Sequence, residues 1–251
     1  MRSLFQSRAV QPVAVAEPVR TVFPKIEGCS MAAVFCSKRV AGDFYDALRV
    51  GPQRILFGLL DVAGRRDDNR GILTSAQKIL RTMGTELFAG NDINESEVMT
   101  ELSHLLNRGI TDAAHGVRSC PAFIGCYHEE LGTLCYTNAG HTPALLRDGA
   151  GVLELGSTGL PLGLFSHATI EAPTVAVPRD AVFLLVSRGV VEAEGKISKV
   201  EDLQFGLERV KERLGNIASR DAREICIGIV DPLADHMTHE DRTAFAFVRQ
   251  A

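Results

Sequence analysis

The stretch Arg54-Ile55-Leu56-Phe57-Gly58-Leu59-Leu60 is a nearly continuous apolar run that ends at Asp61 and continues as Val62-Ala63-Gly64. An apolar run of this length is typical of a strand buried on both faces. The period then changes, because apolar residues recur every three or four positions between 72 and 88. This spacing places them on one face of a helix. The sequence therefore predicts a buried strand followed by an amphipathic helix.

The same two periods predict the other elements. We expect further strands at 31–40, 122–128, 133–137, 144–147, 152–155, 181–186 and 243–248. We expect further helices at 95–110, 205–214 and 221–233, the first of them capped by Asn94. Strands outnumber helices, and short turns join neighbouring strands into hairpins. This pattern favours an antiparallel, layered α+β fold over a doubly wound parallel sheet.

Composition excludes several classes of protein. The 251 residues are 45% apolar and 23% charged, which argues for a globular chain. The net charge is −4 with no block of like charges, so neither a nucleic-acid surface nor a membrane-surface patch is expected. No run of 18 apolar residues predicts a membrane span, and the polar, proline-interrupted start does not resemble a signal peptide. We therefore expect a cytoplasmic protein.

Two further expectations concern the cysteines and the domain limits. None of the six cysteines forms a CxxC pair, so we expect reduced thiols in the core and no zinc ribbon. Residues 1–24 contain Pro12, Pro18 and Pro24 between short apolar pairs. They predict an extended N-terminal arm, with a single domain over residues 25–251.

Acidic residues stand at the ends of predicted strands. Asp43 follows the strand at 31–40, Asp61 ends the apolar run, and Glu240 and Asp241 precede the last strand. Each of them alone is explained by a turn, because aspartate commonly begins turns. Together they also suit Mg²⁺ or Mn²⁺, since these ions take oxygen ligands and need only a few carboxylates. The spacing alone leaves both explanations open.

Six short strings decide between them by resemblance. In chain order they are AGDFYD at 41–46, DVAG at 61–64, NAGHTP at 138–143, GLPLGL at 159–164, FGLER at 205–209 and EDRT at 240–243. Their order and rough spacing, from about residue 28 to residue 249, resemble the SpoIIE-like branch of the PPM-type metal-dependent serine/threonine phosphatases. The resemblance implies an antiparallel β-sandwich flanked by α-helices.

The resemblance also implies a site and a function. Asp61 would bridge two Mn²⁺ or Mg²⁺ ions, and the Val62 carbonyl and Asp43 would complete one of them, Asp43 partly through water. Asp241 would hold the other ion, and a metal-bridging water would attack the phosphorus. The implied substrates are phosphoserine or phosphothreonine proteins, often regulators that control anti-sigma factors. The helices at 72–88 and 95–110 would transmit regulation or form a homodimer.

One position departs from the family pattern. Where the family has Thr-Asp-Gly-Val after the strand at 181–186, this chain has Ser187-Arg188-Gly189-Val190. An arginine cannot ligate a cation, and it stays protonated. Three readings of Arg188 follow. It takes the place of the ion and pairs with Asp61 and Asp241, or it binds substrate phosphate beside one remaining ion. In the third reading, Glu240 or Asp235 supplies the missing metal ligand.

These readings predict two functions. The first is a metal-dependent protein phosphatase, and the alternative is a catalytically impaired pseudophosphatase that binds a phosphoprotein or partner.

Two other candidate groups have simpler explanations. His236 and His239 suit a solvated loop better than a metal pair, because no third soft ligand lies at zinc spacing. His141, between Gly140 and Pro143, suits a structural turn.

Overall fold

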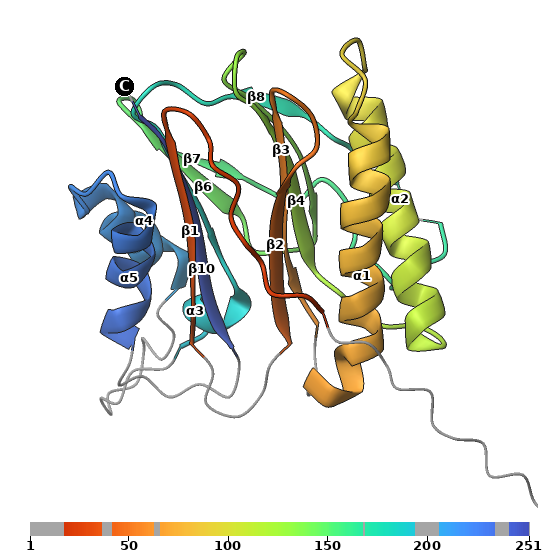
Figure 1. The fold of residues 1–251 in the computed structure, drawn as a ribbon. Coiled ribbons are helices and arrows are strands. Elements are labelled where there is room, and N and C mark those ends of the chain that lie inside the picture. The colour runs from red at the N-terminus through yellow and green to blue at the C-terminus, as the bar shows by residue number, and fades with distance from the viewer. Residues whose placement is uncertain are drawn as a thin grey trace, which may run out of the picture.

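The computed structural model describes residues 18–36, 42–62, 66–167, 169–193, 206–233 and 241–250. These residues form two antiparallel sheets packed face to face, with helices on both outer sides (Figure 1). The first sheet has the order β1 (Cys29–Cys36), β10 (Arg242–Arg249), β9 (Val182–Val186), β6 (Ala144–Asp148), β7 (Gly151–Leu155). The second has the order β2 (Asp43–Arg49), β3 (Arg54–Asp61), β4 (Ala122–His128), β5 (Thr133–Ala139), β8 (Thr174–Ala176). The predicted α+β sandwich is confirmed.

The central strand β3 explains why its sequence is apolar throughout. Alternate side chains of a strand point to opposite faces of its sheet. Leu56 and Leu60 face α1 (Arg66–Leu87) and α2 (Glu95–Ala114), whereas Phe57 faces the other sheet. There its ring centroid lies 5.5 Å from that of Phe183 and 5.1 Å from that of Phe245. Both faces of β3 are therefore buried, as the apolar run predicts.

Helices cover the outer face of each sheet (Figure 1). The helices α1 and α2 pack on the second sheet, and α4 (Gly206–Asn216) and α5 (Ala222–Val230) pack on the first. As predicted, Asn94 caps α2, because its side chain accepts hydrogen bonds from the backbone N–H groups of Ser96 and Glu97. A four-residue helix, α3 (Arg188–Val191), follows β9, and a 3₁₀ turn (Asp231–Leu233) follows α5.

Three local predictions are corrected. The apolar spacing predicted a helix over 72–88, but α1 already begins at Arg66, so the charged stretch before residue 72 is helical and not a loop. The strand expected at 31–40 begins at Cys29 and runs to Cys36, and residues 37–41 lie outside the described part. The sequence did not reveal strand β2, because its buried Asp46 breaks the apolar alternation. Asp43 therefore begins a strand in addition to following one.

The described part of the N-terminal arm, residues 18–24, lies against β2 and α1. The Thr21 hydroxyl donates to the backbone carbonyl of Tyr45, and the ring of Phe23 stacks on that of Tyr45 with centroids 6.1 Å apart. The domain boundary at residue 25 stays a prediction.

All six cysteines are free thiols. Among the described residues, no helix has both the length and the apolar content needed to cross a bilayer.

Candidate functional site

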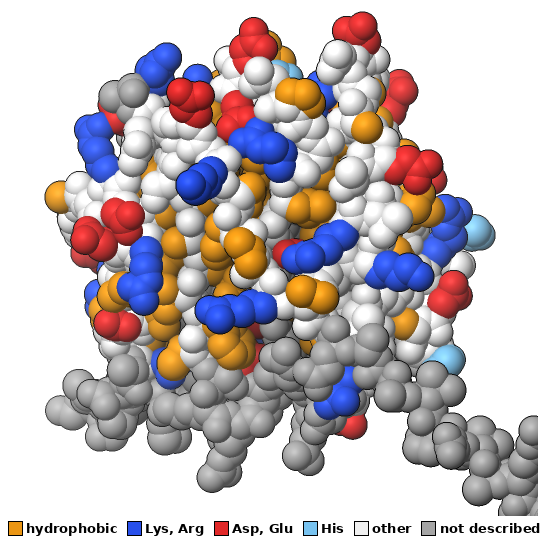
Figure 2. All heavy atoms as spheres, in the orientation of Figure 1, with side chains coloured by type: hydrophobic (Ala, Val, Ile, Leu, Met, Phe, Trp, Pro, Cys, Tyr) orange, Lys and Arg blue, Asp and Glu red, His pale blue; other side chains and the backbone are white. Residues whose placement is uncertain are grey.

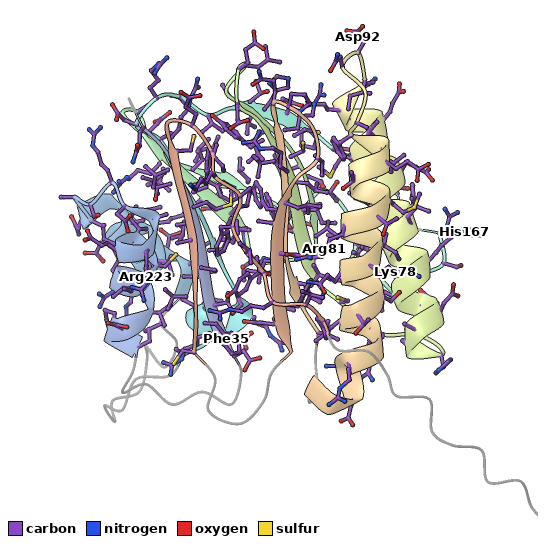
Figure 3. All side chains as sticks on the ribbon, in the orientation of Figure 1. Phe35, Lys78, Arg81, Asp92, His167 and Arg223 are labelled. Carbon is purple, nitrogen blue, oxygen red and sulfur yellow. The ribbon has the colours of Figure 1, made fainter. Side chains whose placement is uncertain are left out.

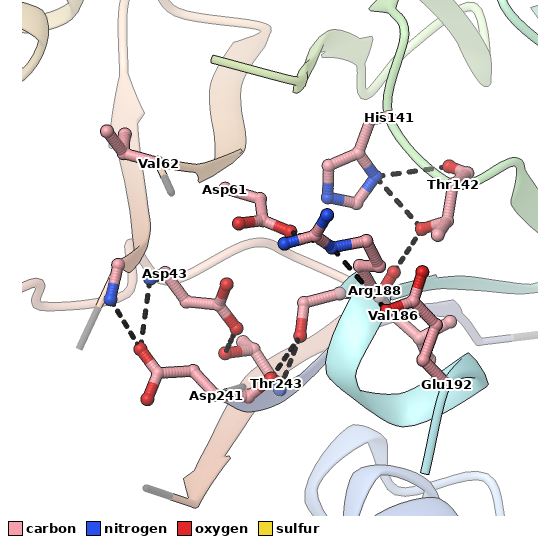
Figure 4. A network of polar contacts seen from close by, with 12 residues as sticks. Asp43, Asp61, Val62, His141, Thr142, Val186, Arg188, Glu192, Asp241 and Thr243 are labelled. Atoms are coloured by element: carbon pink, nitrogen blue, oxygen red, sulfur yellow. Dashed lines mark hydrogen bonds and ion pairs between the residues drawn. The ribbon is translucent and has the colours of Figure 1, made fainter. Parts of the chain in front are cut away.

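Strand pairing brings the predicted acidic residues to one edge of the sandwich. In an antiparallel pair, the end of one strand lies beside the start of the other. Asp43 at the start of β2 therefore pairs directly with Asp61 at the end of β3. In the other sheet, the end of β9 pairs with the start of β10, which brings Arg188 and Asp241 to the same edge. Figure 4 shows these four side chains grouped between the ends of the two sheets.

Asp43 lies at the centre of this group. Its Oδ2 atom accepts a 2.6 Å hydrogen bond from the Thr243 hydroxyl. Burial raises the pKa of Asp43 well above its usual range, and the nearby carboxylate of Asp61 raises it further. Both effects disfavour the charged form of the carboxyl. The described part of the site therefore holds more carboxyl groups than its neighbouring positive charges and hydrogen-bond donors stabilise in the charged form.

Asp241 is turned toward the backbone that leads into β2. Its Oδ2 atom accepts hydrogen bonds from the backbone N–H of Gly42 at 2.5 Å and from that of Asp43 at 3.2 Å. Its Oδ1 atom is buried and has no hydrogen-bond partner. Ser187 fixes the backbone here, because its hydroxyl donates to the Asp241 carbonyl and accepts from the Thr243 N–H. Asp241 thus joins the first sheet to the start of β2.

Arg188 lies against the carboxylate that the resemblance makes the bridging ligand. Its Nε atom is 3.7 Å from Oδ2 of Asp61 and 3.8 Å from Oε2 of Glu192 (Figure 4). Arg188 is the first residue of α3, which begins directly after Ser187 at the end of β9. The ion pair with Asp61 agrees with the first of the three readings of Arg188. That reading also expected a pair with Asp241, whose described hydrogen bonds come from the backbone N–H groups of Gly42 and Asp43.

The backbone carbonyl of Val62, another expected ligand, is engaged by a side chain. Asn69, in the first turns of α1, donates a 3.1 Å hydrogen bond from Nδ2 to this carbonyl. Asn69 was not among the predicted site residues, because the apolar period that predicts the helix begins only at residue 72. The helical start of α1 is what aims the amide at Val62. The sequence does show an amide residue eight positions after Asp61, but the charged residues around it lack the apolar spacing that would indicate a helix.

His141 also contributes to this edge. It follows Gly140, which has a φ of +69°, and its backbone N–H donates to Oδ1 of Asn138 at 2.8 Å. The ring Nδ1 lies 3.1 Å from both the carbonyl and the hydroxyl oxygen of Thr142, and that hydroxyl donates to the carbonyl of Val186. The hydroxyl hydrogen is thereby used, so both Thr142 oxygens act as acceptors and Nδ1 carries the proton.

The other ring nitrogen, Nε2, is buried and has no hydrogen-bond partner. Burial lowers the pKa of His141 to about 4, which keeps the ring neutral near pH 7. The structural turn predicted for His141 therefore accounts for its backbone but not for its ring. Its ring is a neutral acceptor on the same side as Arg188 and Asp61 (Figure 4).

The described residues do not fit a site for two ions. Among them, no group of three or more His, Cys, Asp or Glu side chains is arranged to hold a metal. The contacts explain this, since Asp61 faces Arg188, Asp241 faces backbone N–H groups and the Val62 carbonyl is bonded to Asn69. The predicted substitutes Glu240 and Asp235, and the histidines His236 and His239, lie outside the described residues.

Comparison with known proteins identifies relatives over most of the chain. The phosphoserine phosphatase RsbP of Bacillus subtilis is 25% identical over 195 residues, which cover 76% of this chain and 45% of RsbP. Protein IcfG of Synechocystis is 24% identical over 211 residues, which cover 76% of this chain and 33% of IcfG. The chain thus spans less than half the length of either relative.

Solved structures share the fold. The RsbU and RsbW domains of Rv1364c from Mycobacterium tuberculosis superpose with a TM-score of 0.75 at 21% identity, covering 91% of this chain and 63% of that one. The PP2C phosphatase domain of SpoIIE from Bacillus subtilis, with a fragment of its regulatory domain, gives 0.71 at 15% identity, covering 90% and 64%. At these identities the likeness shows the architecture alone.

A family model matches most of the sequence. The model for stage II sporulation protein E (SpoIIE) matches residues 51–250, which include the ends of β3, β9 and β10 that carry the site. With the sandwich and the order of its motifs, this match shows that the chain belongs to the SpoIIE-like family of PPM-type phosphatases.

Proposed function

We propose that this chain is a partner-binding member of its family in which an arginine replaces one metal ion, so that phosphoserine hydrolysis is weak or lost. The partner is a bacterial regulatory protein with a target serine or threonine, such as a regulator of an anti-sigma factor. One observation carries the proposal: the guanidinium of Arg188 lies on Asp61, the carboxylate that would bridge the ions. A fixed positive charge at that place repels a divalent cation.

The bond from Asn69 to the Val62 carbonyl supports the same conclusion. It occupies the backbone oxygen that would complete the first ion, independently of Arg188. Two expected ligand groups on adjacent residues, the carboxylate of Asp61 and the carbonyl of Val62, are therefore engaged by groups that carry hydrogen-bond donors. Donors of this kind compete with a cation for the same lone pairs.

The charges of the site also indicate which form of the partner it accepts. Three carboxyl groups, Asp43, Asp61 and Asp241, lie at this edge, and the guanidinium of Arg188 pairs with Asp61. Without cations these carboxyl groups disfavour a phosphate dianion. We therefore propose that the unphosphorylated partner binds at least as tightly as the phosphorylated one.

Two measurements on the purified protein test the proposal. Calorimetry with Mn²⁺ should show fewer than two sites of useful affinity. Hydrolysis of an aryl phosphate and of a phosphoserine peptide with Mn²⁺ should proceed no faster than in an Asp61→Asn control. Two metal sites together with a clear rate advantage over the control would contradict the proposal.

One observation favours a second candidate function, a metal-dependent serine/threonine phosphatase. The Oδ1 atom of Asp241 is buried without a hydrogen-bond partner, which is uncommon unless a ligand binds there. The side chain of Arg188 is 42% exposed, so it has room to leave Asp61. The two measurements above decide between the candidates, because this one requires Mn²⁺ binding that Asp61→Asn abolishes.

A further inference from the structure

A groove runs along the front of the molecule beside the candidate site. It lies between the end of strand β1 at Phe35, the start of β2 from Asp43 to Tyr45, and the N-terminal segment 18–21. Its volume is about 240 Å³. Asp43 belongs to both the groove and the candidate site, so the two are continuous.

The N-terminal wall of this front groove is held in place by polar contacts. The side-chain amide of Gln77 on α1 bonds both the backbone N–H and the carbonyl of Val19, at 2.6 and 2.7 Å. The hydroxyl of Thr21 shares its one hydrogen between the Tyr45 carbonyl and Oδ1 of Asp46, at 2.8 and 3.0 Å. Asp46 is fully buried and pairs through both oxygens with Arg81, at 2.7 and 3.0 Å. The wall is thus a fixed part of the surface.

These contacts hold the backbone of the wall and leave its apolar side chains in solvent. Val19 is 63% exposed and Val22 is 79% exposed. Val19 and Phe35 line the groove, and Val22 follows the wall directly in the chain. Together they make up three of the eight exposed large apolar side chains among the described residues. Exposed apolar side chains that gather beside a groove mark a binding surface more often than single scattered ones do.

The surrounding face is basic. Lys78 and Arg223 lie on the same face as Phe35, together with Arg81, whose charge is offset by Asp46 (Figure 3). Figure 2 shows the blue side chains of this face spread among the orange apolar ones. Arg20 lines the groove itself. A surface with this charge attracts acidic segments, which increases the rate of association and selects partners.

We propose that the front groove binds an extended segment of the partner that adjoins the target serine or threonine and carries an apolar anchor and acidic residues. The inference rests on the proposed function, since it takes the partner to engage the continuous site at Asp43. The apolar anchor lies between Val19 and Phe35, and the acidic residues lie along Arg20 and its basic neighbours. Alternative occupants are a second copy of this chain and an anionic membrane surface.

The probe is a library of random peptides with a fixed central serine, displayed on phage and selected on the full chain. Enriched peptides should carry a large apolar residue at a constant distance from the serine, with Asp or Glu nearby. Fluorescence anisotropy should show that Val19→Asp weakens their binding about tenfold, which corresponds to about 1.4 kcal/mol. Arg20→Glu should weaken it most at low salt, where screening is least.

Val117→Asp is the matched control, because Val117 is a valine of similar exposure, 77%, in the loop after α2. It should leave peptide binding unchanged. Circular dichroism checks that Val19→Asp folds, and Phe35→Ala provides an independent variant without a new charge. Absence of a shared peptide pattern, or equal binding by Val19→Asp and Val117→Asp, would overturn the proposal.

Two further measurements address the alternative occupants. Self-association in sedimentation that Val19→Asp abolishes would assign the groove to a second copy and overturn the proposal. Binding to phosphatidylglycerol vesicles that Val19→Asp abolishes would assign it to a membrane, with the same consequence. A chain that hydrolyses phosphopeptides with two Mn²⁺ ions would refute the proposed function, whereas the effect of Val19→Asp on peptide binding would still test the groove.

Discussion

The Nε atom of Arg188 lies 3.7 Å from Oδ2 of Asp61, so an arginine side chain neutralises the carboxylate that would bridge the ions of a two-metal phosphatase. The pair is partly exposed, since 42% of the Arg188 side chain is accessible. A pair with this exposure contributes about 1 kcal/mol or less to stability. Its larger effect is on which ligand the site can accept.

The first prediction concerns Arg188→Asp. This change removes the guanidinium that pairs with Asp61 and adds a further carboxylate, so the metal-free protein should unfold at a lower temperature. Stability should then depend on Mn²⁺, by about 2.7 kcal/mol at a hundredfold excess over Kd. Thermal melts with and without Mn²⁺ measure both effects, and phosphatase activity should rise in the same variant.

Arg223→Asp is the control for this prediction, because Arg223 is an exposed arginine near the start of α5. It makes the same change in charge far from Asp61 and should give no response to Mn²⁺. If Arg188→Asp melts as the wild type does, with and without Mn²⁺, then Arg188 has no part in the site.

Sequence reasoning predicted the sandwich because its decisive strands have simple patterns. The apolar run of β3 and the later hairpins follow from burial and turn chemistry. Strand β2 was not predicted, because Asp46 is buried in a position where alternation requires an apolar residue. Its partners Gln77 and Arg81 lie on α1, some 30 positions away, and only the folded structure shows that they compensate the buried charge.

The candidate site was predictable to a similar extent. The motifs placed Asp43, Asp61, Asp241 and Arg188 at strand ends, and strand pairing brings them to one edge. Their mutual orientation was not predictable, since it depends on hydrogen bonds between distant segments. The bond from Gly42 to Asp241 joins residues 199 positions apart, and no local pattern encodes it.

A second prediction tests the buried pair of Asp46 and Arg81. Arg81→Met leaves the fully buried Asp46 carboxylate without its counter-ion. The free energy of unfolding should fall by about 3 kcal/mol, the low end for a broken buried pair, because the Arg81 side chain is itself 37% exposed. Urea denaturation measures the change. Lys78→Met, an exposed substitution on the same helix, should cost far less, and equal costs would show that the pair is not coupled.

A third prediction concerns the glycine that places His141. Gly140 has a φ of +69°, and a Cβ atom there would lie 2.6 Å from Cγ and 2.7 Å from Cδ of Pro161. Gly140→Ala should therefore lower stability by about 1–3 kcal/mol through backbone strain and overpacking. Gly149→Ala is the matched control, because no atom lies within 4 Å of its Cβ position. Equal urea midpoints for the two variants would argue against the close contact with Pro161.

The last prediction is a dependence of stability on pH caused by His141. Burial lowers the pKa of its ring to about 4 from 6.5, so the unfolded chain binds a proton more readily than the folded one. The contribution of His141 is complete above pH 6.5 and is lost as the pH falls toward 4. The loss amounts to about 3.5 kcal/mol at most, since the pKa falls from 6.5 to about 4 and one pKa unit corresponds to about 1.4 kcal/mol.

Titration of Asp43 changes stability with pH in the opposite direction, so each histidine variant must be compared with the wild type. Its pKa is raised well above 3.8 by burial and by Asp61, and its contribution therefore decreases as the pH rises. The effect of His141 is isolated by His141→Gln, which should flatten the curve of unfolding free energy between pH 4 and 6.5. His167→Gln, at an exposed histidine, should keep the wild-type slope. Parallel curves for wild type and His141→Gln would show that the ring of His141 reaches solvent and titrates as it does in the unfolded chain.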